Sequence, residues 1–374
     1  MASIHVFLAG GGTGGHLFPG IAVARELKRR HPQVEVVFVG AGRPLETQVL
    51  SREGFVLERV RTGGLVGKSW SQLVRSLLLV PLGLFDAARL VRGYAPRLVV
   101  GLGGYSSGPV VLWAALCRLP TMVMEQNTVP GVTNRWLARV VRASALSSEA
   151  ALPYFAGTGF VSGNPVRPGF FGLAPPRPDP ETVQVLVVGG SQGAHAVNVA
   201  MVEAAPALAE SSRGLRITHQ TGERDVTLVR DGYRAAGLEA RVEPFLDEME
   251  QEMASADLVV CRAGATTLAE VAAAGRPAIL VPFPFATHDH QRRNAAVVRD
   301  AGAAEVIDPN DLSGERLGAR IVALASDDER RASLASASRK LGRPDAASVI
   351  VDRMEHLLAL ENKTTAPERD ERSG

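Results

Sequence analysis

The chain has 374 residues, of which 46% are hydrophobic, and its 41 basic and 39 acidic side chains leave a formal net charge of +2. This length and apolar content fit two folded domains and exclude a mainly disordered chain, while the charge balance excludes a general nucleic-acid binder. Two cysteines, Cys117 and Cys261, are too few for a disulfide framework or a zinc site. Because Met1 leads almost directly into an apolar strand, without a basic and apolar leader, we expect a cytosolic protein.

Apolar runs rich in β-branched residues recur along the chain, each followed by a turn signal and a helical stretch. The strands predicted in the first half are Ile4–Ala9, Val36–Val39, Leu98–Val100, Thr121–Met124 and Ala143–Leu146. Those predicted in the second half are Val183–Val188, Leu215–Thr218, Arg241–Val242, Leu258–Val260, Ala278–Val281 and Glu305–Ile307. Strands without polar alternation, separated by helices, are typical of parallel sheets covered on both faces. The fold class predicted is therefore α/β, with two doubly wound, Rossmann-like domains facing across a cleft.

The domain boundary is predicted after Gly163, giving an N-terminal domain 1–163 and a second domain 164–345. Five prolines and no apolar period in Pro168–Pro180 favour a linker. A helix over about 346–361 is expected to join the N-terminal domain. The polar residues 362–374 are expected to be a disordered tail.

Two glycine-rich turns stand between a predicted strand and a predicted helix. The first is Gly10-Gly11-Gly12-Thr13-Gly14-Gly15-His16, and the second is Gly189-Gly190-Ser191-Gln192-Gly193. Such a turn points backbone N–H groups and a helix N-terminus at one spot, which favours an anion, above all phosphate. Gly10, Gly12 and Gly15 also satisfy a dinucleotide fingerprint, but no Asp or Glu ends the second strand to hold a ribose.

His16 follows the first turn, where a helix is expected to begin. A helix N-terminus disfavours imidazolium, which leaves a neutral ring able to accept a proton. His16 is therefore the candidate general base, and a capping or turn histidine is the alternative.

Further polar or glycine-rich segments follow other strands of the first half. The cluster Gly101–Pro109 is either a flexible loop or a place where backbone approaches a ligand closely. Glu125, Gln126 and Asn127 end a strand on the carboxyl edge, where ligand contacts are expected. Arg167 is either a diphosphate ligand or an ordinary surface arginine.

In the second half, Cys261–Glu270 runs from a strand through a turn into a helix. Thr267 and Glu270 fit a capping box, and a glutamate in this place is equally suited to binding both ribose hydroxyls. His288, Asp289 and His290 allow a metal site, but no further ligand pattern joins them, so contacts to sugar hydroxyls are favoured.

Together these blocks resemble the MurG family, the inverting GT-B N-acetylglucosaminyltransferases of peptidoglycan synthesis. The matching blocks are Gly10–Pro19, Gly103–Pro109, Glu125–Asn127, Gly163–Arg167, Gly189–Gly193, His219–Gly222, Phe245–Asp247, Cys261–Glu270 and His290–Gln291 with Asn294. They occur in family order over nearly the whole chain. The resemblance implies transfer of N-acetylglucosamine from UDP-N-acetylglucosamine to the muramyl 4-hydroxyl of lipid I, forming lipid II without a cofactor or metal.

The resemblance also implies roles for particular residues. The backbone of Leu246 would bind uracil, Glu270 the ribose, and Ser191 with Arg167 the diphosphate. The full set of implied donor-binding residues is Thr13, Gly14, Gly15, Asn127, Arg167, Ser191, Leu246, Ala265, Glu270, His290 and Gln291. The implied acceptor-binding residues are Gly12, Gly104, Tyr105 and Ser106.

The implied acceptor is a membrane lipid, and Lys68–Arg92 fits that need. This segment carries Trp70, Leu73, Leu77, Leu78, Leu82 and Phe85 among Lys68, Arg75, Arg89 and Arg92. Interleaved apolar and basic residues are typical of an interfacial helix attracted to anionic lipid, and a buried helix is the alternative. We therefore expect a peripheral protein on the cytoplasmic face of a bacterial membrane, with cell-wall synthesis proteins as potential partners.

Three other functions remain open at this level. Another lipid-directed glycosyltransferase, such as a diacylglycerol sugar transferase, would share the donor turns. A UDP-sugar epimerase would need no lipid face, and a plain nucleotide-binding module would need no base.

Overall fold

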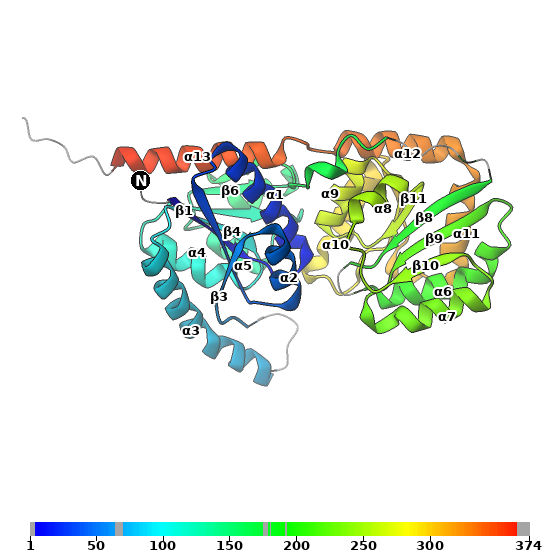
Figure 1. The fold of residues 1–374 in the computed structure, drawn as a ribbon, viewed down its shortest axis with the longest axis horizontal. Helices are drawn as coiled ribbons and strands as arrows, with labels where there is room; N and C mark the ends of the chain where they lie inside the picture. Colours follow the sequence, from blue (N-terminus) through cyan, green and yellow to red (C-terminus); the bar gives the residue numbers. More distant parts are fainter. Residues whose placement is uncertain (1–3, 64–69, 175–178, 180, 191–192, 365–374) are drawn as a thin grey trace, which may run out of the picture. The chain divides into compact units, whose positions relative to one another are not determined.

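The computed structural model describes residues 4–63, 70–174, 179, 181–190 and 193–364, without the side chains of residues 70–78, 287 and 360–364. The chain divides into two compact units. The first comprises Met1–Gln126, Pro130–Gly163 and Asp345–Gly374, and the second comprises Asn127–Val129 and Asn164–Pro344. Each unit is a central sheet with helices on both faces (Figure 1).

The first unit is built on a seven-stranded sheet in the order β3-β2-β1-β4-β5-β6-β7. Its strands are β1 Ile4–Gly10, β2 Val34–Gly40, β3 Val56–Arg59, β4 Leu98–Gly103, β5 Thr121–Glu125, β6 Ala143–Leu146 and β7 Gly159–Val161. Its helices are α1 Gly14–Arg30, α2 Pro44–Glu53, α3 Trp70–Tyr94, α4 Ser107–Leu116, α5 Val132–Leu137, the 3₁₀ helix η1 Glu149–Phe155 and α13 Ala346–Thr364. The short strands β3 and β7 were not predicted.

The second unit has a six-stranded sheet in the order β10-β9-β8-β11-β12-β13. Its strands are β8 Thr182–Val188, β9 Gly214–Gln220, β10 Ala240–Glu243, β11 Leu258–Cys261, β12 Ala278–Leu280 and β13 Ala304–Val306. Its α-helices are α6 His195–Ala209, α7 Val226–Ala235, α8 Met249–Ser255, α9 Ala265–Ala274, α10 His290–Asp300, α11 Gly314–Ser326 and α12 Asp328–Leu341. Its 3₁₀ helices are η2 Pro168–Phe170, η3 Glu223–Asp225, η4 Thr287–Asp289 and η5 Pro309–Asp311.

All strand pairs in both sheets are parallel. In each sheet the strand that enters a glycine turn, β1 or β8, lies in the middle, where the strand order reverses direction. Ligands of doubly wound sheets bind outside the carboxyl ends of strands at this switch point. The prediction of two doubly wound Rossmann-like domains is confirmed, and both glycine turns lie at switch points.

The apolar residues of the strands face two buried layers in each unit. In the first unit, one layer includes Val6, Leu8 and Phe38, while the other includes Phe7, Val37 and Val39. Neighbouring residues of one strand thus enter opposite layers, because successive side chains of a strand point to opposite faces. This explains why the strands lack polar alternation.

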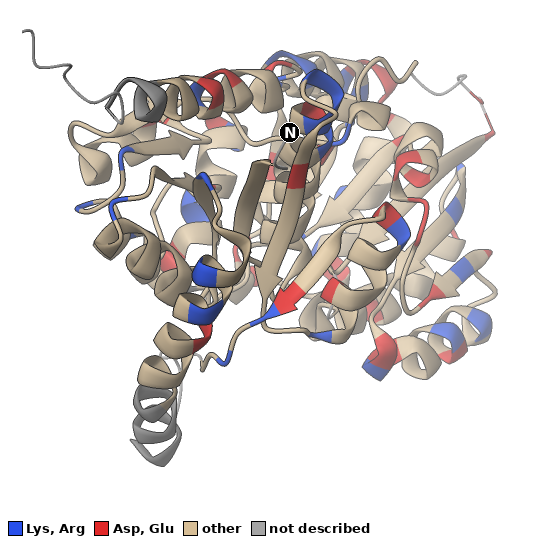
Figure 2. Ribbon diagram, turned by 60° about the vertical axis from the view of Figure 1, so that its left-hand side comes forward, with Lys and Arg blue, Asp and Glu red and all other residues tan. Residues whose placement is uncertain are grey.

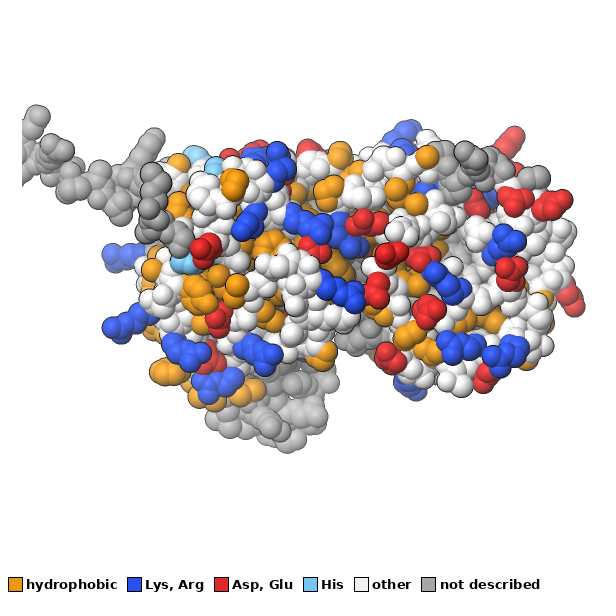
Figure 3. Space-filling model, in the orientation of Figure 1, with side chains coloured by type: hydrophobic (Ala, Val, Ile, Leu, Met, Phe, Trp, Pro, Cys, Tyr) orange, Lys and Arg blue, Asp and Glu red, His pale blue; other side chains and the backbone are white. Residues whose placement is uncertain are grey.

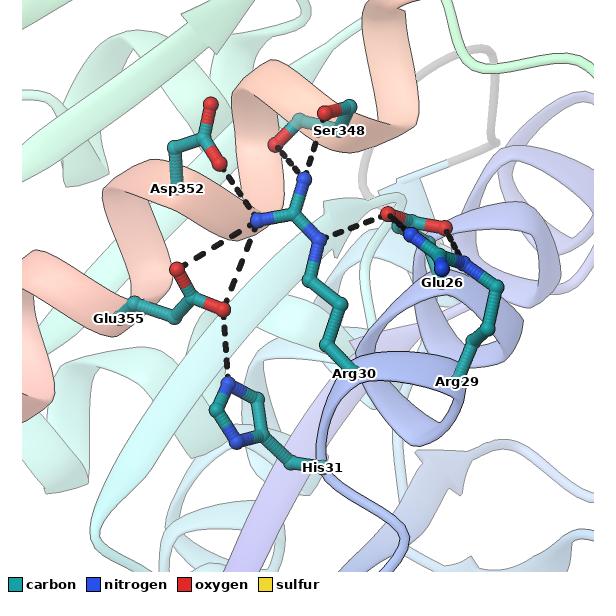
Figure 4. A network of polar contacts seen from close by, with 7 residues as sticks. All are labelled: Glu26, Arg29, Arg30, His31, Ser348, Asp352 and Glu355. Carbon is teal, nitrogen blue, oxygen red and sulfur yellow. Dashed lines mark hydrogen bonds and ion pairs between the residues drawn. The ribbon is translucent and has the colours of Figure 1, made fainter.

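Helix α13 packs on α1 in the first unit (Figure 1). Ile350, Val351, Met354 and Leu357 are at most 3% exposed and join the core layer of Val6 and Leu8. Above this apolar seam lies a polar network (Figure 4). Arg30 donates to Asp352 at 2.5 Å and to Ser348 at 2.5 Å, and His31 pairs with Glu355 at 2.7 Å. Since partly exposed ion pairs contribute little, the apolar seam supplies most of the attachment.

Two predictions about connecting segments need correction. The predicted linker Pro168–Pro180 begins with η2, and its Phe170 is fully buried against Val166, Leu246 and Met253. Burying a side chain of this size stabilises the fold, so the first part of the segment belongs to the second unit's core. Helix α13 continues through Thr364, past the expected start of the tail at Asn362, and residues 365–374 lie outside the described residues.

Candidate active site

The first glycine turn connects β1 to α1, and Thr13 is the N-cap of that helix. Gly14 and Gly15 are therefore its first two residues, as a phosphate-type turn requires. Gly10 has a φ of +139°, and a Cβ there would lie 2.5 Å from the carbonyl oxygen of Gly103. The register between β1 and β4 shifts at this point and pairs Gly10 with Gly103. Close approach of two strands thus requires glycine here, before any ligand is considered.

An internal carboxylate already contacts the first turn. Glu46 is 1% exposed on α2, and its Oε1 accepts the Gly12 N–H at 2.5 Å while its Oε2 accepts the Arg43 N–H at 2.8 Å. Sequence reasoning missed Glu46 because it sought an acid at the end of the second strand, whereas this one stands six residues beyond β2. Gly12, a predicted acceptor residue, therefore has its N–H committed to an anion of the chain itself.

His16 is the third residue of α1 and is partly buried. Its Nδ1 lies 2.9 Å from Oε1 of Gln126, whose Nε2 donates to the carbonyl oxygen of Leu102 at 3.1 Å. His16 therefore has a structural partner on this side of its ring, besides the role of base expected for it. Its other nitrogen, Nε2, lies on the opposite side of the ring from this bond.

The glycine cluster after Leu98–Val100 is not a loop throughout. Strand β4 continues to Gly103 and α4 begins at Ser107, with the buried Ser106 as its N-cap. A Cβ at Gly103 would lie 2.8 Å from Nδ1 of His16, and one at Gly104 would lie 3.1 Å from the Gly11 carbonyl oxygen. These two glycines make room for His16 and the first turn, and Tyr105 and Ser106 follow directly.

Glu125 and Gln126 are the next correction, because both point into the unit rather than toward a ligand. Glu125 is 3% exposed, and its Oε2 accepts from the Gly131 N–H at 3.1 Å and from Asn134 at 3.0 Å. Gln126 is 5% exposed and holds His16 and Leu102. Buried polar groups must find partners inside the protein, which these do.

The second glycine turn follows β8 and is held by β9. The Gly189 N–H donates to the Gln220 carbonyl oxygen at 3.2 Å, and the Gln220 side chain donates to the Gly190 carbonyl oxygen at 2.8 Å. A Cβ at Gly193 would lie 2.0 Å from the Thr221 carbonyl oxygen, so only glycine fits. Ser191, the predicted diphosphate ligand of this turn, lies outside the described residues.

Behind this turn lies a buried chain of neutral groups. Nδ1 of His219 accepts a hydrogen bond from the Tyr233 hydroxyl at 2.7 Å, and its Nε2 donates to Oδ1 of Asn198 at 3.0 Å. Nδ2 of Asn198 in turn donates to the Thr221 carbonyl oxygen at 2.9 Å. Burial lowers the pKa of His219 to about 3, so the ring is neutral at physiological pH. Asn198 also donates to Asp225, which pairs with His195 at the start of α6.

Leu246 is 5% exposed, and its backbone N–H donates to Oε1 of Gln220 at 3.1 Å. The same amide that holds Gly190 thus holds the residue expected to bind uracil. This bond occupies the Leu246 N–H, so the backbone carbonyl oxygen is the group left to bind uracil. Sequence reasoning missed Gln220, although its position at the carboxyl end of β9 was a signal.

Of the two alternatives left open for Thr267 and Glu270, the capping box is wrong. Helix α9 begins at Ala265 with Gly264 as its N-cap and no side-chain cap. Thr267 is consequently the third residue of the helix, and Glu270 stands on its second turn. The predicted ligand Ala265 is the first helical residue, where backbone N–H groups lack helical partners.

Glu270 and Arg167 belong to one charged cluster. Arg167 Nε lies 3.4 Å from Glu250 and its Nη2 lies 4.0 Å from Glu270, while the guanidinium stacks on Phe170 at 5.1 Å. Burial raises the pKa of Glu270 to about 7, with Glu250 adding to the rise and Arg167 opposing it. A carboxyl group whose pKa lies near neutral pH, placed beside a guanidinium, is typical of a ligand site.

Asn127 lies in the short segment that belongs to the second unit. The buried Asn294 of α10 donates to Asn127 at 3.3 Å and to the Ala263 carbonyl oxygen at 3.3 Å. Asn294 also accepts from both the backbone N–H and the hydroxyl of Thr128, at 3.1 Å and 2.9 Å. Asn294 therefore connects Asn127 with the turn before α9, and Thr128 is a participant that sequence reasoning missed.

The predicted sugar ligands His290 and Gln291 open α10. Oε1 of Gln291 accepts the Phe283 N–H at 2.9 Å, which attaches α10 to the segment after β12. His288 and Asp289 just before it have positive φ values of 54° and 55°. Among the residues that the structure describes, no group of three or more His, Cys, Asp or Glu side chains is placed to hold a metal ion.

The predicted interfacial segment falls mostly on α3. Leu82 and Phe85 are 41% and 66% exposed, and Arg89 and Arg92 are exposed as well. The basic positions of the described part of this helix lie toward its C-terminal end (Figure 2), and charged and apolar side chains mix on the surface over it (Figure 3). Lys68 and the side chains of Trp70, Leu73, Arg75, Leu77 and Leu78 lie outside the described residues. Within the described chain, no helix is long and apolar enough to cross a membrane.

Comparison with known proteins defines the class first. Residues 6–146 match the glycosyltransferase family 28 N-terminal domain and residues 184–350 match the glycosyltransferase family 28 C-terminal domain. The chain therefore belongs to glycosyltransferase family 28. The first glycine turn lies in the match to the N-terminal domain, and the second lies in the match to the C-terminal domain.

Individual relatives narrow this to one family of transferases. The chain is 48% identical over 356 residues to the UDP-N-acetylglucosamine--N-acetylmuramyl-(pentapeptide) pyrophosphoryl-undecaprenol N-acetylglucosamine transferase of Anaeromyxobacter sp. (strain Fw109-5), covering 93% of this chain and 92% of the relative. It matches the crystal structure of Acinetobacter baumannii MurG with a TM-score of 0.74 at 30% identity, covering 94% and 99%. The chain belongs to this MurG family of transferases.

A third comparison concerns the fold alone. A putative UDP-N-acetylglucosamine 2-epimerase from Listeria monocytogenes matches with a TM-score of 0.70 at 16% identity, over 98% and 99% of the two chains. Epimerases thus share the architecture, and residue-level similarity favours the transferases.

Proposed function

We propose that this protein transfers N-acetylglucosamine from UDP-N-acetylglucosamine to the muramyl 4-hydroxyl of lipid I, the undecaprenyl-diphosphate-linked muramyl pentapeptide, forming lipid II. The observation that carries this proposal is the identity of 48% to a named transferase over nearly the full length of both chains. The geometry supports it, since the first unit holds the partly buried His16 beside its glycine turn and the second unit holds a carboxylate–guanidinium pair, Glu270 and Arg167.

The reaction is a single displacement that inverts the anomeric carbon. The acceptor 4-hydroxyl oxygen forms a bond to C1 of the sugar, the C1–oxygen bond to UDP breaks, and UDP leaves with that electron pair. The hydroxyl proton goes to Nε2 of His16, which acts as general base. Arg167 and the backbone N–H groups of the second turn stabilise the charge that develops on the leaving diphosphate.

Donor binding is proposed to centre on the second unit. In this arrangement the ionised Glu270 accepts both ribose hydroxyls, and the Leu246 carbonyl oxygen accepts the uracil N3–H. Ala265, Asn127, His290 and Gln291 contact the sugar. Thr13, Gly14 and Gly15 are proposed to meet the donor from the first unit, and Gly12, Gly104, Tyr105 and Ser106 to bind the acceptor.

The test is UDP release by the purified chain with and without a lipid-linked muramyl pentapeptide. The proposal expects release that depends on this acceptor and on UDP-N-acetylglucosamine. Acceptor-independent formation of an epimerised UDP-sugar would contradict it in favour of an epimerase. Release with diacylglycerol as acceptor would favour the other class of lipid-directed transferase.

We also infer that the first unit docks on the cytoplasmic face of a bacterial membrane, with α3 in the interface. Exposed Leu82 and Phe85 would insert among anionic lipids, and Arg89 and Arg92 would each add about 1 kcal/mol of electrostatic attraction. Vesicles containing phosphatidylglycerol should bind the parent chain and release it as salt rises. The double variant Leu82→Ser/Phe85→Ser should bind less and lose activity on long-chain lipid I.

A short-chain, water-soluble lipid I analogue provides the control for this docking. Its turnover by the double variant should equal that of the parent, because the two glycine turns are untouched. Equal loss on both acceptors with a lower melting temperature would show that these side chains stabilise the fold instead. The exposed Leu228 on α7 of the second unit, replaced by serine, is a matched control for lost apolar surface.

A further inference from the structure

We propose that Gln126 is a positioning residue that selects the protonated nitrogen of His16 and thereby leaves the lone pair on Nε2 free to accept a proton. This inference rests on the proposed function and goes beyond it, because it names the group that prepares the base. Its basis is the buried hydrogen-bond chain from Leu102 through Gln126 to His16.

The direction of this chain follows from its first member. The Leu102 carbonyl oxygen has no proton to give, so the Gln126 atom 3.1 Å away must be the Nε2 donor. The other amide atom, Oε1, then faces His16 Nδ1 at 2.9 Å and is an acceptor. His16 must therefore carry its proton on Nδ1, which leaves Nε2 unprotonated in the neutral ring.

The surroundings hold both partners in place. Gln126 is 5% exposed, and its backbone carbonyl oxygen receives the Ser147 hydroxyl at 2.5 Å. The His16 ring lies against the backbone of Gly103 and Gly104, where a Cβ would come within 2.8 Å and 3.7 Å of ring atoms. A glutamine fixed at both ends and a ring seated on glycine leave little freedom for the opposite tautomer.

The neutrality of Gln126 is part of the inference. A carboxylate at the same place would stabilise imidazolium and reduce the fraction of His16 able to accept a proton, whereas an amide orients the ring without adding charge. The elements around the first turn carry the titratable or charged groups Glu46, Arg43, Tyr105 and Glu125. Glu46 and Glu125 are bound to backbone N–H groups, and Arg43 donates to the Gly12 carbonyl oxygen at 3.1 Å.

The experiment measures kcat against pH for the full chain with saturating UDP-N-acetylglucosamine and a water-soluble lipid I analogue. Gln126→Glu should move the acid limb of the profile upward by about one pH unit or more and keep the alkaline plateau. Gln126→Met should lower kcat by about tenfold or more without moving this limb upward, because the tautomer is no longer selected. The KM of either substrate should change far less than kcat.

Gln48→Glu is the matched control, since Gln48 is exposed on α2 of the same unit and undergoes the same chemical change. Its profile should coincide with that of the parent. An unmoved acid limb in Gln126→Glu, together with an inactive His16→Ala, would overturn the positioning role alone. Normal turnover by His16→Ala would overturn both the base and the role of Gln126, and acceptor-independent UDP release would overturn the proposed function.

A second measurement needs no variant of Gln126. In ¹⁵N-histidine-labelled parent protein above pH 8, long-range proton–nitrogen correlation spectra distinguish the two tautomers of each ring. His16, assigned by the peak lost in His16→Ala, should be the Nδ1–H tautomer. A spectrum with the proton on Nε2 would overturn the inference whatever the folding of the variants.

Discussion

The two glycine turns hold the same place in two sheets whose strand orders agree apart from the extra edge strand β7 of the first, yet different chemistry secures them. In the first unit the Glu46 carboxylate accepts the Gly12 N–H, so an internal anion is bound to the turn. In the second unit the neutral amide of Gln220 donates to the Gly190 carbonyl oxygen, and neutral Asn198 and His219 stand behind it. Asn198 also contacts the carboxylate of Asp225, which is paired with His195.

This difference is consistent with different tasks for the two turns under the function proposed above. A diphosphate approaching Gly12 would meet a carboxylate that already holds its N–H, whereas one approaching Gly190 would meet neutral groups. Phosphate binding at a glycine turn thus depends on what the rest of the domain places against it. In the proposed mechanism the first turn presents the base, His16, and the second turn holds the charged donor.

The largest expected effect is on the first turn. His16→Ala should lower kcat by about 10²–10⁴ because the acceptor proton loses its base. Steady-state UDP release with both substrates saturating measures this. His31→Ala, at the other end of α1, is the matched control and should keep parental kcat. Near-normal turnover by His16→Ala would remove the functional distinction between the turns.

The next effect concerns the carboxylate of the second unit. Glu270→Ala should weaken UDP-N-acetylglucosamine binding by roughly 1.5–3 kcal/mol, the contribution of hydrogen bonds to a charged group. Isothermal titration calorimetry measures the Kd, with the exposed Glu239→Ala as control. An unchanged Kd with a lower melting temperature would make Glu270 a structural residue.

The raised pKa of Glu270 gives a pH dependence of defined sign. The pKa of Glu270 is about 7 in the folded chain, and its ordinary value is 4.5. Between these two pH values the folded state therefore keeps a proton that the unfolded state has lost. The free energy of unfolding should therefore fall as pH rises from about 4.5 to 7, while affinity for UDP-N-acetylglucosamine should rise through pH 7. Glu270→Gln should flatten both trends, and an identical slope in that variant would assign them to other groups.

Exchanging the groups that hold the turns tests the comparison directly. Gln220→Glu replaces the Nε2 donor to Gly190 with a carboxylate and keeps an acceptor for the Leu246 N–H. UDP binding should weaken by about tenfold, on the scale of 1.4 kcal/mol for a charged group near phosphate, while uridine binding should change much less. Equal losses for UDP and uridine would show that Gln220 acts on Leu246 rather than on the phosphate turn.

The reciprocal exchange, Glu46→Gln, should have the smallest effect. The amide oxygen still accepts the Gly12 N–H, but charge assistance is lost and the amide nitrogen cannot accept the N–H of the exposed Arg43, so the free energy of unfolding should fall by about 1 kcal/mol. Chemical denaturation measures this, and the KM for UDP-N-acetylglucosamine should stay at the parental value. A marked rise in that KM would mean that both turns bind the donor phosphates.

Much of the local structure was predictable from the sequence. Apolar runs without polar alternation predicted parallel strands at nearly their observed positions, because strands buried on both faces need no polar side. The T-x-x-E pattern misplaced the start of α9, since Gly264 takes an extended conformation and the helix begins at Ala265. Strands β3 and β7 were missed because Val56–Arg59 ends in two charged residues and Gly159–Val161 begins with glycine, so neither forms an apolar run rich in β-branched residues.

The sequence by itself determined the two glycine turns, the α/β architecture and the residues able to carry chemistry, because these depend on neighbours along the chain. Only the tertiary structure decided their partners. Glu46 meets Gly12 across 34 residues, Gln126 meets His16 across 110, and Asn294 meets Thr128 across 166. Such pairs form where strand ends converge at the switch point of a sheet, and no spacing in the sequence encodes which side chains meet there.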